Sequence, residues 1–311
     1  MKATVIKSTG SWYAVLTTDG ERVECRIKGK FRMEGSRTTN PVAVGDKVEI
    51  EMDAGEATGS ILKIEPRKNY IIRRSINLSK QSQILAANID KAYLIVTLAS
   101  PRTSLGFIDR FLLTAEAYGI PVEIVFNKAD LYSEEGLGLV KELTALYEKL
   151  GYSCTLLSSL APGPGVTALL ERMKGAVNLV AGHSGVGKST LINLLDPQLA
   201  LRTGELSEAH DKGTHTTTFA EMFVLQNGGF VIDTPGIKEL GLVDMEKAEL
   251  AHYFPEMKLL LNQCRFNNCK HLNEPSCAVI EAVRTGQIAE SRYACYLGIM
   301  SGEELDKEYD D

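Results

Sequence analysis

A chain of 311 residues is long for one domain, so we expect two or three. Apolar residues make up 44% and charged residues 24% of the chain, as in soluble globular proteins in general. Because there is no apolar run of about 18 residues and no signal-peptide core, we expect a cytoplasmic protein that does not enter a membrane. A net charge of −6 does not indicate a nucleic-acid binder, and the six cysteines favour metal binding or burial over disulfides.

Residues 1–68 contain short segments in which apolar and polar residues alternate, separated by turn residues such as Asp19-Gly20. This period of two predicts half-buried β-strands. Five short strands in so little sequence indicate a small barrel of the oligonucleotide-binding (OB) type. The predicted strands span 4–7, 12–16, 23–27, 47–50 and 60–64.

Basic side chains are frequent in the same stretch, which holds 12 Lys and Arg against 10 Asp and Glu. Together with an aromatic ring they fit a face that follows a nucleic-acid backbone and stacks on bases. A charged barrel surface without a ligand fits these residues equally well, so both interpretations stay open. The residues are Arg22, Arg26, Lys28, Lys30, Phe31, Arg32 and Arg37.

Beyond a polar, basic linker over roughly 69–90, apolar strands alternate with helices. This alternation predicts a mostly parallel sheet covered on both faces, which binds ligands where its strands end. The predicted strands span 92–97, 122–126, 154–157, 177–181 and 230–232, and the helices 108–118, 134–150 and 188–195.

The strand over 177–181 is followed by Gly-x-x-x-x-Gly-Lys-Ser, the pattern of a phosphate-binding loop. In such loops the glycines let backbone N–H groups wrap around phosphates at a helix N-terminus. The lysine reaches the β- and γ-phosphates, and the serine hydroxyl binds Mg²⁺. The predicted phosphate-binding residues are Gly182, His183, Ser184, Gly185, Val186, Gly187, Lys188, Ser189 and Thr190.

Asn127-Lys128-Ala129-Asp130 directly follows the strand over 122–126 and fits a guanine-recognition motif. The Asp130 carboxylate can accept hydrogen bonds from the N1–H and the exocyclic amine of guanine, whereas adenine offers neither donor there. Lys128 can lie over the base, and Asn127 can brace the loop. Ser158, after the next strand, lies where a backbone contact to the guanine O6 is expected. The sequence therefore predicts GTP and GDP as ligands.

Asp233-Thr234-Pro235-Gly236 follows the last predicted strand and fits the second Mg²⁺ motif of a GTPase. Asp233 would act on Mg²⁺ through a water, and the Gly236 N–H would meet the γ-phosphate. A threonine of the run 213–218 can complete the Mg²⁺ shell, although the same run also fits a plain turn into a strand. The guanine motif precedes the phosphate loop here, so the domain is predicted to be circularly permuted.

The residue that orients the attacking water is less obvious from the sequence. Many GTPases place glutamine directly after this motif, but Ile237 stands there and its alkyl side chain cannot hold a water. His215 is the nearest polar candidate, because neutral imidazole can accept a hydrogen bond from water. We therefore predict His215 as the catalytic residue.

Four soft metal ligands lie within a short stretch near the C-terminus: Cys264, Cys269, His271 and Cys277. Three thiolates and one imidazole suit a tetrahedral Zn²⁺ without an open position, which predicts a structural site in a small helical domain. Unrelated cysteines are the alternative. The other cysteines, Cys25, Cys154 and Cys295, lie in apolar or helical contexts and are predicted to be packing residues.

The order of barrel, permuted GTPase and zinc domain resembles the RsgA family of small ribosomal subunit biogenesis GTPases. The segments that carry the resemblance are 87–90, 182–189, 213–218, 233–236 and the four metal ligands. The resemblance implies an assembly factor for late maturation of the 30S subunit that contacts 16S rRNA, with a slow GTPase that the subunit stimulates and whose hydrolysis goes with release. It also implies Thr217 as the Mg²⁺ ligand and agrees with His215 as the catalytic residue.

The predicted fold class is therefore multi-domain, with an OB-type β-barrel (1–68), a permuted α/β GTPase domain (69–245) and a small helical zinc domain (246–311). We expect a monomer. Two other functions stay open: an RNA-binding module with a passive nucleotide, and a GTP switch with a protein partner. Because the chain runs from Gly236 directly toward the zinc domain, we hypothesise that phosphate loss repositions that domain. The acidic end over 303–311 is interpreted as a solvated tail.

Overall fold

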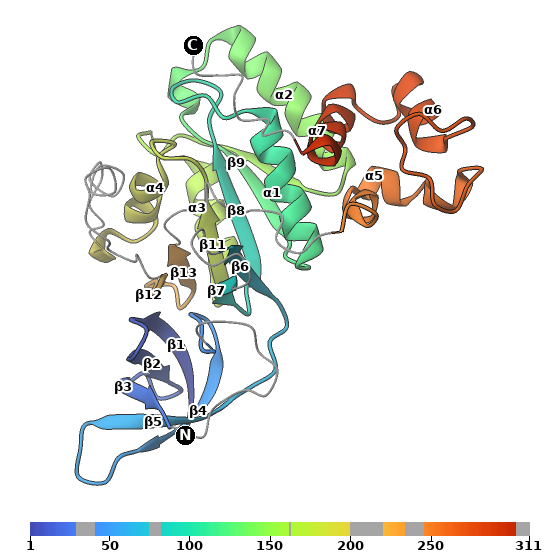
Figure 1. Ribbon diagram of the computed structural model, residues 1–311. Coiled ribbons are helices and arrows are strands. Elements are labelled where there is room, and N and C mark those ends of the chain that lie inside the picture. The colour runs from blue at the N-terminus through green and yellow to red at the C-terminus, as the bar shows by residue number, and fades with distance from the viewer. Residues whose placement is uncertain (29–40, 75–81, 162, 200–219, 234–245, 303–311) are drawn as a thin grey trace, which may run out of the picture.

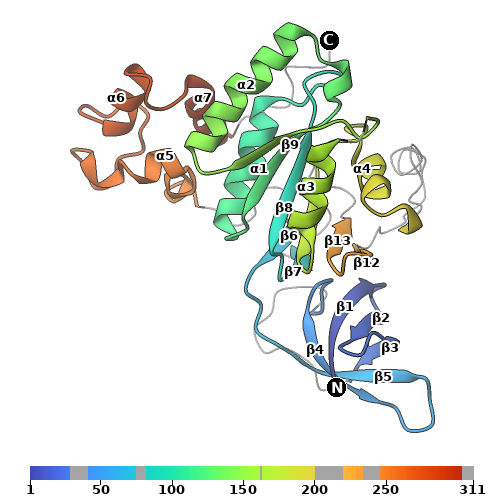
Figure 2. The ribbon, with the colours of Figure 1, turned by 180° about the vertical axis from the view of Figure 1, so that it is seen from behind.

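The structure is a computed structural model that describes residues 1–28, 41–74, 82–161, 163–199, 220–233 and 246–302. A barrel lies at one end of a central sheet with its helices, and a C-terminal helical region lies against the side of that central part (Figures 1 and 2). Within the described ranges, no helix is both long and apolar enough to cross a membrane.

Residues 1–28 and 41–64 form the predicted barrel. Its strands pair in the closed order β1-β2-β3-β5-β4-β1, in which only β3 and β5 run parallel. Alternate side chains such as Val5, Val15 and Ile61 fill the interior, as the period of two requires. All five predicted strands are present. They are β1 (Lys2–Ser8), β2 (Tyr13–Thr17), β3 (Arg22–Ile27), β4 (Lys47–Met52) and β5 (Thr58–Ile64).

The central sheet has the order β10-β9-β8-β11-β13-β12, and only β12 runs antiparallel to its neighbour. Its strands are β8 (Lys91–Val96), β9 (Val122–Phe126), β10 (Ser153–Leu156), β11 (Val177–Ala181), β12 (Glu221–Val224) and β13 (Phe230–Asp233). β9 and β11 are buried along their whole length because helices cover both faces. This confirms the predicted α/β class.

Two helices pack on each face of the central sheet. One apolar cluster joins α1 and α2 to one face, and a second joins α3 and α4 to the other (Figures 1 and 2). The helices are α1 (Leu105–Ala117), α2 (Glu134–Lys149), α3 (Pro164–Met173) and α4 (Lys188–Leu195), with short 3-10 turns η1 (Ala129–Leu131) and η2 (Pro197–Leu199). The predicted motifs directly follow the carboxyl ends of β9, β11 and β13.

The barrel strands continue the central sheet, because one barrel strand pairs with its edge strand. Strand β1 pairs antiparallel with β12 at Lys7 and Glu221, whose side chains also form an ion pair with an N–O distance of 3.0 Å. Ile6 and Val44 of the barrel belong to the same apolar cluster as Met222 of β12. Burial of this shared cluster fixes the barrel against the central domain.

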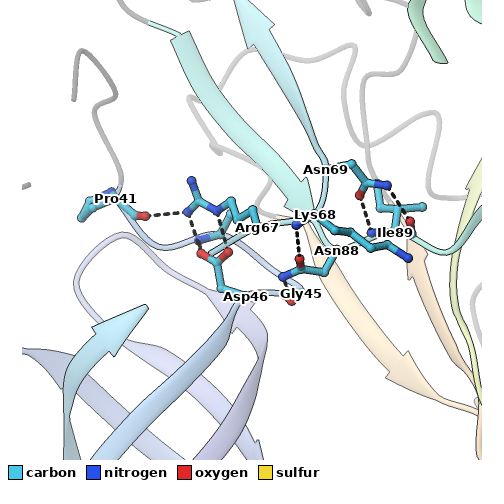
Figure 3. Close-up of polar contacts among 9 residues, drawn as sticks. Pro41, Gly45, Asp46, Arg67, Lys68, Asn69, Asn88 and Ile89 are labelled. Atoms are coloured by element: carbon cyan, nitrogen blue, oxygen red, sulfur yellow. Dashed lines mark hydrogen bonds and ion pairs between the residues drawn. The ribbon is translucent and has the colours of Figure 1, made fainter. Parts of the chain in front are cut away.

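Polar contacts secure the same junction (Figure 3). The buried carboxylate of Asp46 accepts two hydrogen bonds from Arg67, at 2.6 and 2.7 Å, in the bidentate arrangement that makes such pairs strong. Asn88 accepts from the backbone N–H of Lys68 and donates to the carbonyl of Gly45. Hydrogen bonds therefore hold the barrel both to Arg67, just before the hairpin residues 69–87, and to Asn88, just after them.

Residues 69–90 differ from the predicted irregular linker. They contain an antiparallel hairpin of β6 (Tyr70–Arg74) and β7 (Ser82–Ala87). Ile71, Ile72 and Ile84 of this hairpin are buried, and together with Ala86 they cover apolar surface near the barrel. The many basic residues in the stretch concealed this short apolar pattern.

The C-terminal region is a bundle of short helices that packs on α1. Leu113 of α1 belongs to the same apolar cluster as Phe254, Val279 and Tyr296. The elements are η4 (Leu250–Tyr253), α5 (Pro255–Lys258), η5 (Leu261–Gln263), α6 (Ala278–Arg284) and α7 (Glu290–Ser301). The helical character predicted for this part is confirmed.

A buried ionic cluster lies at the contact between this region and the central domain. Arg292 of α7 donates to Asp109 of α1 at 2.9 Å and to Glu256 of α5 at 2.7 Å. The Tyr147 hydroxyl adds a hydrogen bond of 3.0 Å to Asp109. Arg292 and Asp109 are each 1% exposed; burial raises the pKa of Asp109, and the Arg292 charge opposes that rise. Each charge depends on its partner, because neither has access to water.

Candidate nucleotide site and metal centre

The phosphate-binding loop connects β11 to α4 at the carboxyl edge of the sheet. Gly182 and Gly187 have φ angles of 145° and 95°, which other residues rarely adopt. A Cβ atom at Gly182 would lie 2.2 Å from the carbonyl oxygen of Ile95, and one at Gly187 would lie 2.5 Å from Asn127 Nδ2. Both positions therefore require glycine, because the backbone of the loop approaches its neighbours this closely.

Lys188 is the first residue of α4, where unpaired backbone N–H groups and the helix dipole favour an anion. Its ammonium group donates to the carbonyl oxygens of Gly182 and His183, at 2.8 and 2.7 Å, so the lysine folds back over the loop. This places a positive charge inside the loop that the sequence predicted to surround phosphates. The remaining predicted residues of the loop, Ser184, Gly185, Val186, Ser189 and Thr190, lie between or beside these positions.

Asn127 ties the guanine motif to the phosphate loop. It is fully buried at the end of β9, and its Nδ2 donates to the carbonyl oxygen of Val186 at 2.8 Å. Its Oδ1 accepts from both the backbone N–H and the hydroxyl of Ser159, at 3.0 and 2.9 Å. One side chain thus joins three loops, which the sequence had separated by as many as 59 positions.

Asp130 of the guanine motif contacts Ser158 of the loop that follows β10. The Ser158 hydroxyl donates to Asp130 and accepts from the backbone N–H groups of Leu160 and Ala161. Asp130 is exposed, so part of its carboxylate faces solvent where a base can approach. Lys128 has a φ of 61°, a left-handed conformation that costs a non-glycine residue about 1–2 kcal/mol. Such strain persists where surrounding contacts hold it, often at functional sites.

The Mg²⁺ motif begins at the neighbouring strand. Asp233 is the last residue of β13, and its backbone lies beside Val180 of β11, two residues before the phosphate loop. Its strand position therefore agrees with the prediction. The predicted site residues His215, Thr217 and Gly236 lie outside the described residues.

The four predicted metal ligands come together in the C-terminal region. Their ligand atoms, on Cys264, Cys269, His271 and Cys277, all lie within 4.8 Å of one another. His271 Nδ1 is 3.4 Å from Cys277 Sγ and 3.6 Å from Cys264 Sγ. Separations of roughly 3.5–4 Å suit a tetrahedral ion with bonds of about 2.3 Å to sulfur. The cluster can therefore hold one metal ion.

Two tyrosines of α7 hold the loop that carries His271. The Tyr293 hydroxyl donates to the carbonyl oxygen of His271, and the Tyr296 hydroxyl to that of Lys270, both at 2.7 Å. His271 itself has a φ of 57° and is buried. These bonds fix the ligand loop on the same helix that contributes Arg292 to the contact with α1.

Family models match most of the chain. The model described as RsgA GTPase matches residues 64–243, and the one described as RsgA N-terminal domain matches residues 2–61. The chain belongs to the RsgA GTPase family. Its relatives named small ribosomal subunit biogenesis GTPase RsgA include those of Bacteroides fragilis and Christiangramia forsetii, 55% and 53% identical. These alignments cover 99% and 98% of this chain, and 98% and 97% of the relatives.

Solved structures support the same RsgA assignment. The crystal structure of YjeQ from Thermotoga maritima is 35% identical with a TM-score of 0.78 and covers 97% of both chains. The structure of YloQ, a circularly permuted GTPase, is 28% identical with a TM-score of 0.74 and covers 97% of this chain and 94% of that one. The predicted permuted fold, the GTPase activity and the family resemblance are thereby confirmed.

One further part of this site was not predicted from the sequence. The segment 97–104 between β8 and α1 lies against both nucleotide loops: the Ser100 carbonyl oxygen accepts a hydrogen bond from Lys128, and Pro101 lies beside Gly185. In the following helix, the Phe107 ring lies against the His183 ring at a tilt of 35°. The segment carries no recognisable motif, and its role depends on backbone atoms. Only the fold brings it to the site.

Proposed function

We propose that this RsgA-family chain is a GTPase that acts in maturation of the 30S ribosomal subunit. The observation that carries the proposal is Asn127, which docks a guanine-recognition motif onto a phosphate-binding loop by direct hydrogen bonds. The full-length similarity to proteins named small ribosomal subunit biogenesis GTPase supports the subunit as the partner. In this proposal the 30S subunit stimulates hydrolysis, and hydrolysis releases the protein.

The site residues divide by the part of GTP that they contact. In this proposal Lys128 covers the guanine base, Asp130 accepts its N–H donors, and Ser158 orients Asp130 and contacts the base edge. The run Gly182–Thr190 surrounds the phosphates.

The remaining roles concern Mg²⁺ and the attacking water. We assign Ser189, Thr217 and Asp233 to the Mg²⁺ shell, directly or through water, and the Gly236 N–H to the γ-phosphate. His215 positions the water. The oxygen-rich donor set fits Mg²⁺, which would neutralise charge on the β- and γ-phosphates when GTP is bound.

The three regions also divide the work in this proposal. The barrel (1–68) and the C-terminal domain (246–311) contact 16S rRNA on either side of the GTPase domain (69–245). On the barrel, the exposed Arg26 lies over the half-buried Trp12 ring, with its Cζ 3.7 Å from the ring centroid, and the pair offers an aromatic and cationic surface of the kind that binds nucleic acid. The protein would act as a cytoplasmic monomer.

The test is GTP turnover with and without purified 30S subunits. We expect slow hydrolysis alone and strong stimulation by the subunit, and Lys188→Ala as the matched control should lose both through loss of phosphate binding. Subunit binding without stimulation would favour an RNA-binding module with a passive nucleotide. If rRNA binding did not weaken with salt, a GTP switch with a protein partner would be favoured instead.

We also propose that the Cys264, Cys269, His271 and Cys277 cluster holds one structural Zn²⁺. Three thiolates and an imidazole prefer Zn²⁺ over Mg²⁺, and the closed set leaves no position for a substrate. Because the helices around it are short, the ion would supply much of the local folding energy.

For the metal centre, Cys277→Ser is expected to reduce bound zinc from one equivalent to well below half and to expose the C-terminal region to protease. The matched control is Cys154→Ser, a half-buried cysteine of β10 distant from the cluster. Elemental analysis of purified protein and limited proteolysis measure both effects. Full zinc content in Cys277→Ser would contradict the ligand assignment.

A further inference from the structure

Tyr132 follows the guanine motif and turns its side chain back toward it. Its hydroxyl donates to the carbonyl oxygen of Asn127 at 2.6 Å. The same hydroxyl oxygen accepts from the backbone N–H of Leu98 at 3.1 Å. One phenol therefore connects the first residue of the guanine motif to the segment between β8 and α1.

That segment is itself rigid. Thr103 is 2% exposed, donates its N–H to the carbonyl oxygen of Thr97, and accepts from the Thr97 N–H through its hydroxyl. The Thr97 hydroxyl in turn accepts from the N–H of Ala99 at 3.2 Å. These bonds close residues 97–103 into a compact loop that is held by hydrogen bonds at its base, between Thr97 and Thr103.

The same loop contacts both nucleotide-binding loops. On the guanine side, the carbonyl oxygen of Ser100 accepts from Lys128 Nζ at 2.5 Å. On the phosphate side, Pro101 lies so close that a Cβ atom on Gly185 would be 3.3 Å from its Cδ. The centroid of the Phe107 ring, in the first turn of α1, lies 3.7 Å from that of the His183 ring. The loop over 97–104 thus spans the distance between the base side and the phosphate side.

A nucleotide binds both sides at once, so its bound phosphates fix where the base lies, and the guanine turn must be held at the matching position for Asp130 to accept from both N–H donors of guanine. Asn127 provides one link between the two sides through its side chain. The Tyr132 hydroxyl provides a second, because it joins the Asn127 backbone to the 97–104 loop, whose Pro101 lies beside Gly185. It adds to the other bonds that hold the left-handed turn at Lys128, which include the backbone bonds from Asn127 N–H to Val96 and from Ala129 N–H to Leu157.

We infer that Tyr132 is a specificity-determining positioning residue for guanine, acting through Asn127 and the 97–104 loop. It does not contact the nucleotide. Its hydroxyl holds the turn so that the Asp130 carboxylate meets both N–H donors of guanine together. This inference rests on the proposed GTPase function and assigns part of its base selectivity.

The test compares Tyr132→Phe with Tyr152→Phe. Tyr152→Phe is the matched control, because it removes a hydroxyl bonded to Glu116 in the same domain, away from the site. Tyr132 is only partly buried and phenylalanine keeps its ring, so both variants should fold. Calorimetric titration with GDP and with inosine diphosphate, which lacks the exocyclic amine, measures affinity and selectivity.

For Tyr132→Phe we expect GDP affinity to fall about tenfold, the factor of one hydrogen bond, and inosine diphosphate affinity to fall less than about threefold. The KM for GTP should rise while kcat stays unchanged, because no phosphate contact is lost. Tyr152→Phe should match the wild type in all of these.

Equal losses for GDP and inosine diphosphate, or no loss of GDP affinity, would overturn the inference. Since the wild-type protein is titrated in parallel, this result is distinct from failure of the proposed function. If the wild type itself bound no guanine nucleotide, the function would fail, and the role of Tyr132 with it.

Discussion

Replacing Arg292 with methionine is expected to lower the free energy of unfolding by about 3–5 kcal/mol. The substitution leaves the carboxylates of Asp109 and Glu256 buried without their cation, and Asp109 has no access to water. Urea denaturation followed by circular dichroism measures the loss. The C-terminal region should also separate from α1, which limited proteolysis would detect.

Two further variants make this prediction specific. Arg284→Met removes an exposed ion pair with Glu281 and should change stability by less than about 1 kcal/mol. A triple variant, Arg292→Met with Asp109→Asn and Glu256→Gln, removes the unpaired charges and should recover much of the loss. If Arg292→Met were as stable as Arg284→Met, the cluster would contribute nothing to this contact.

The second large effect concerns catalysis. His215→Ala is expected to lower GTP turnover by about 100-fold or more, both alone and with 30S subunits, because general-base or water-positioning groups contribute this much. GTP affinity should stay nearly unchanged, since His215 is assigned to the water and not to the nucleotide. Single-turnover hydrolysis and nucleotide titration separate the two quantities.

His210→Ala is the matched control, because it removes another histidine from the same part of the chain. It should retain wild-type turnover. Unchanged turnover in His215→Ala would reject the catalytic assignment and leave the attacking water to some other group.

Much of this architecture follows from local sequence patterns. The strand over 177–181 and the helix over 188–195 were predicted with their observed bounds, because continuous apolar runs and the glycine loop between them have few alternatives. The barrel strands were predicted from their alternation of apolar and polar residues. Their closed order, with β3 parallel to β5, depends on long-range pairing that no single segment encodes.

The parts that escaped prediction depend on tertiary contacts. The hairpin of β6 and β7 has only a short apolar pattern within basic sequence. Tyr132 acts through backbone atoms of Leu98 and Asn127, and Arg292 meets Asp109 across 183 positions. Residue type and spacing do not reveal which distant residues will contact each other in the fold. The guanine, phosphate and metal motifs could be predicted because each has characteristic residue types at a characteristic spacing.

The Arg292 cluster also bears on the hypothesis that phosphate loss repositions the C-terminal region. Any movement of α7 relative to α1 must separate Arg292 from Asp109, both of which are excluded from water. We therefore expect α1 and the C-terminal region to move as one body, if they move at all between nucleotide states. The structure of the GDP-bound and GTP-bound protein would test this directly.

The pairing of β1 with β12 has a consequence for how the protein is made. During translation, Lys7 is synthesised early, and more than two-thirds of the chain must follow before its pairing partner Glu221 is made. The central strand β11 likewise follows β8, β9 and β10, so β8 keeps an open edge until then. Unpaired strand edges during synthesis invite wrong pairing. The order of strands along the chain therefore makes the GTPase sheet grow first from β8 toward β10, and its other half is added only when β11 and β13 are complete.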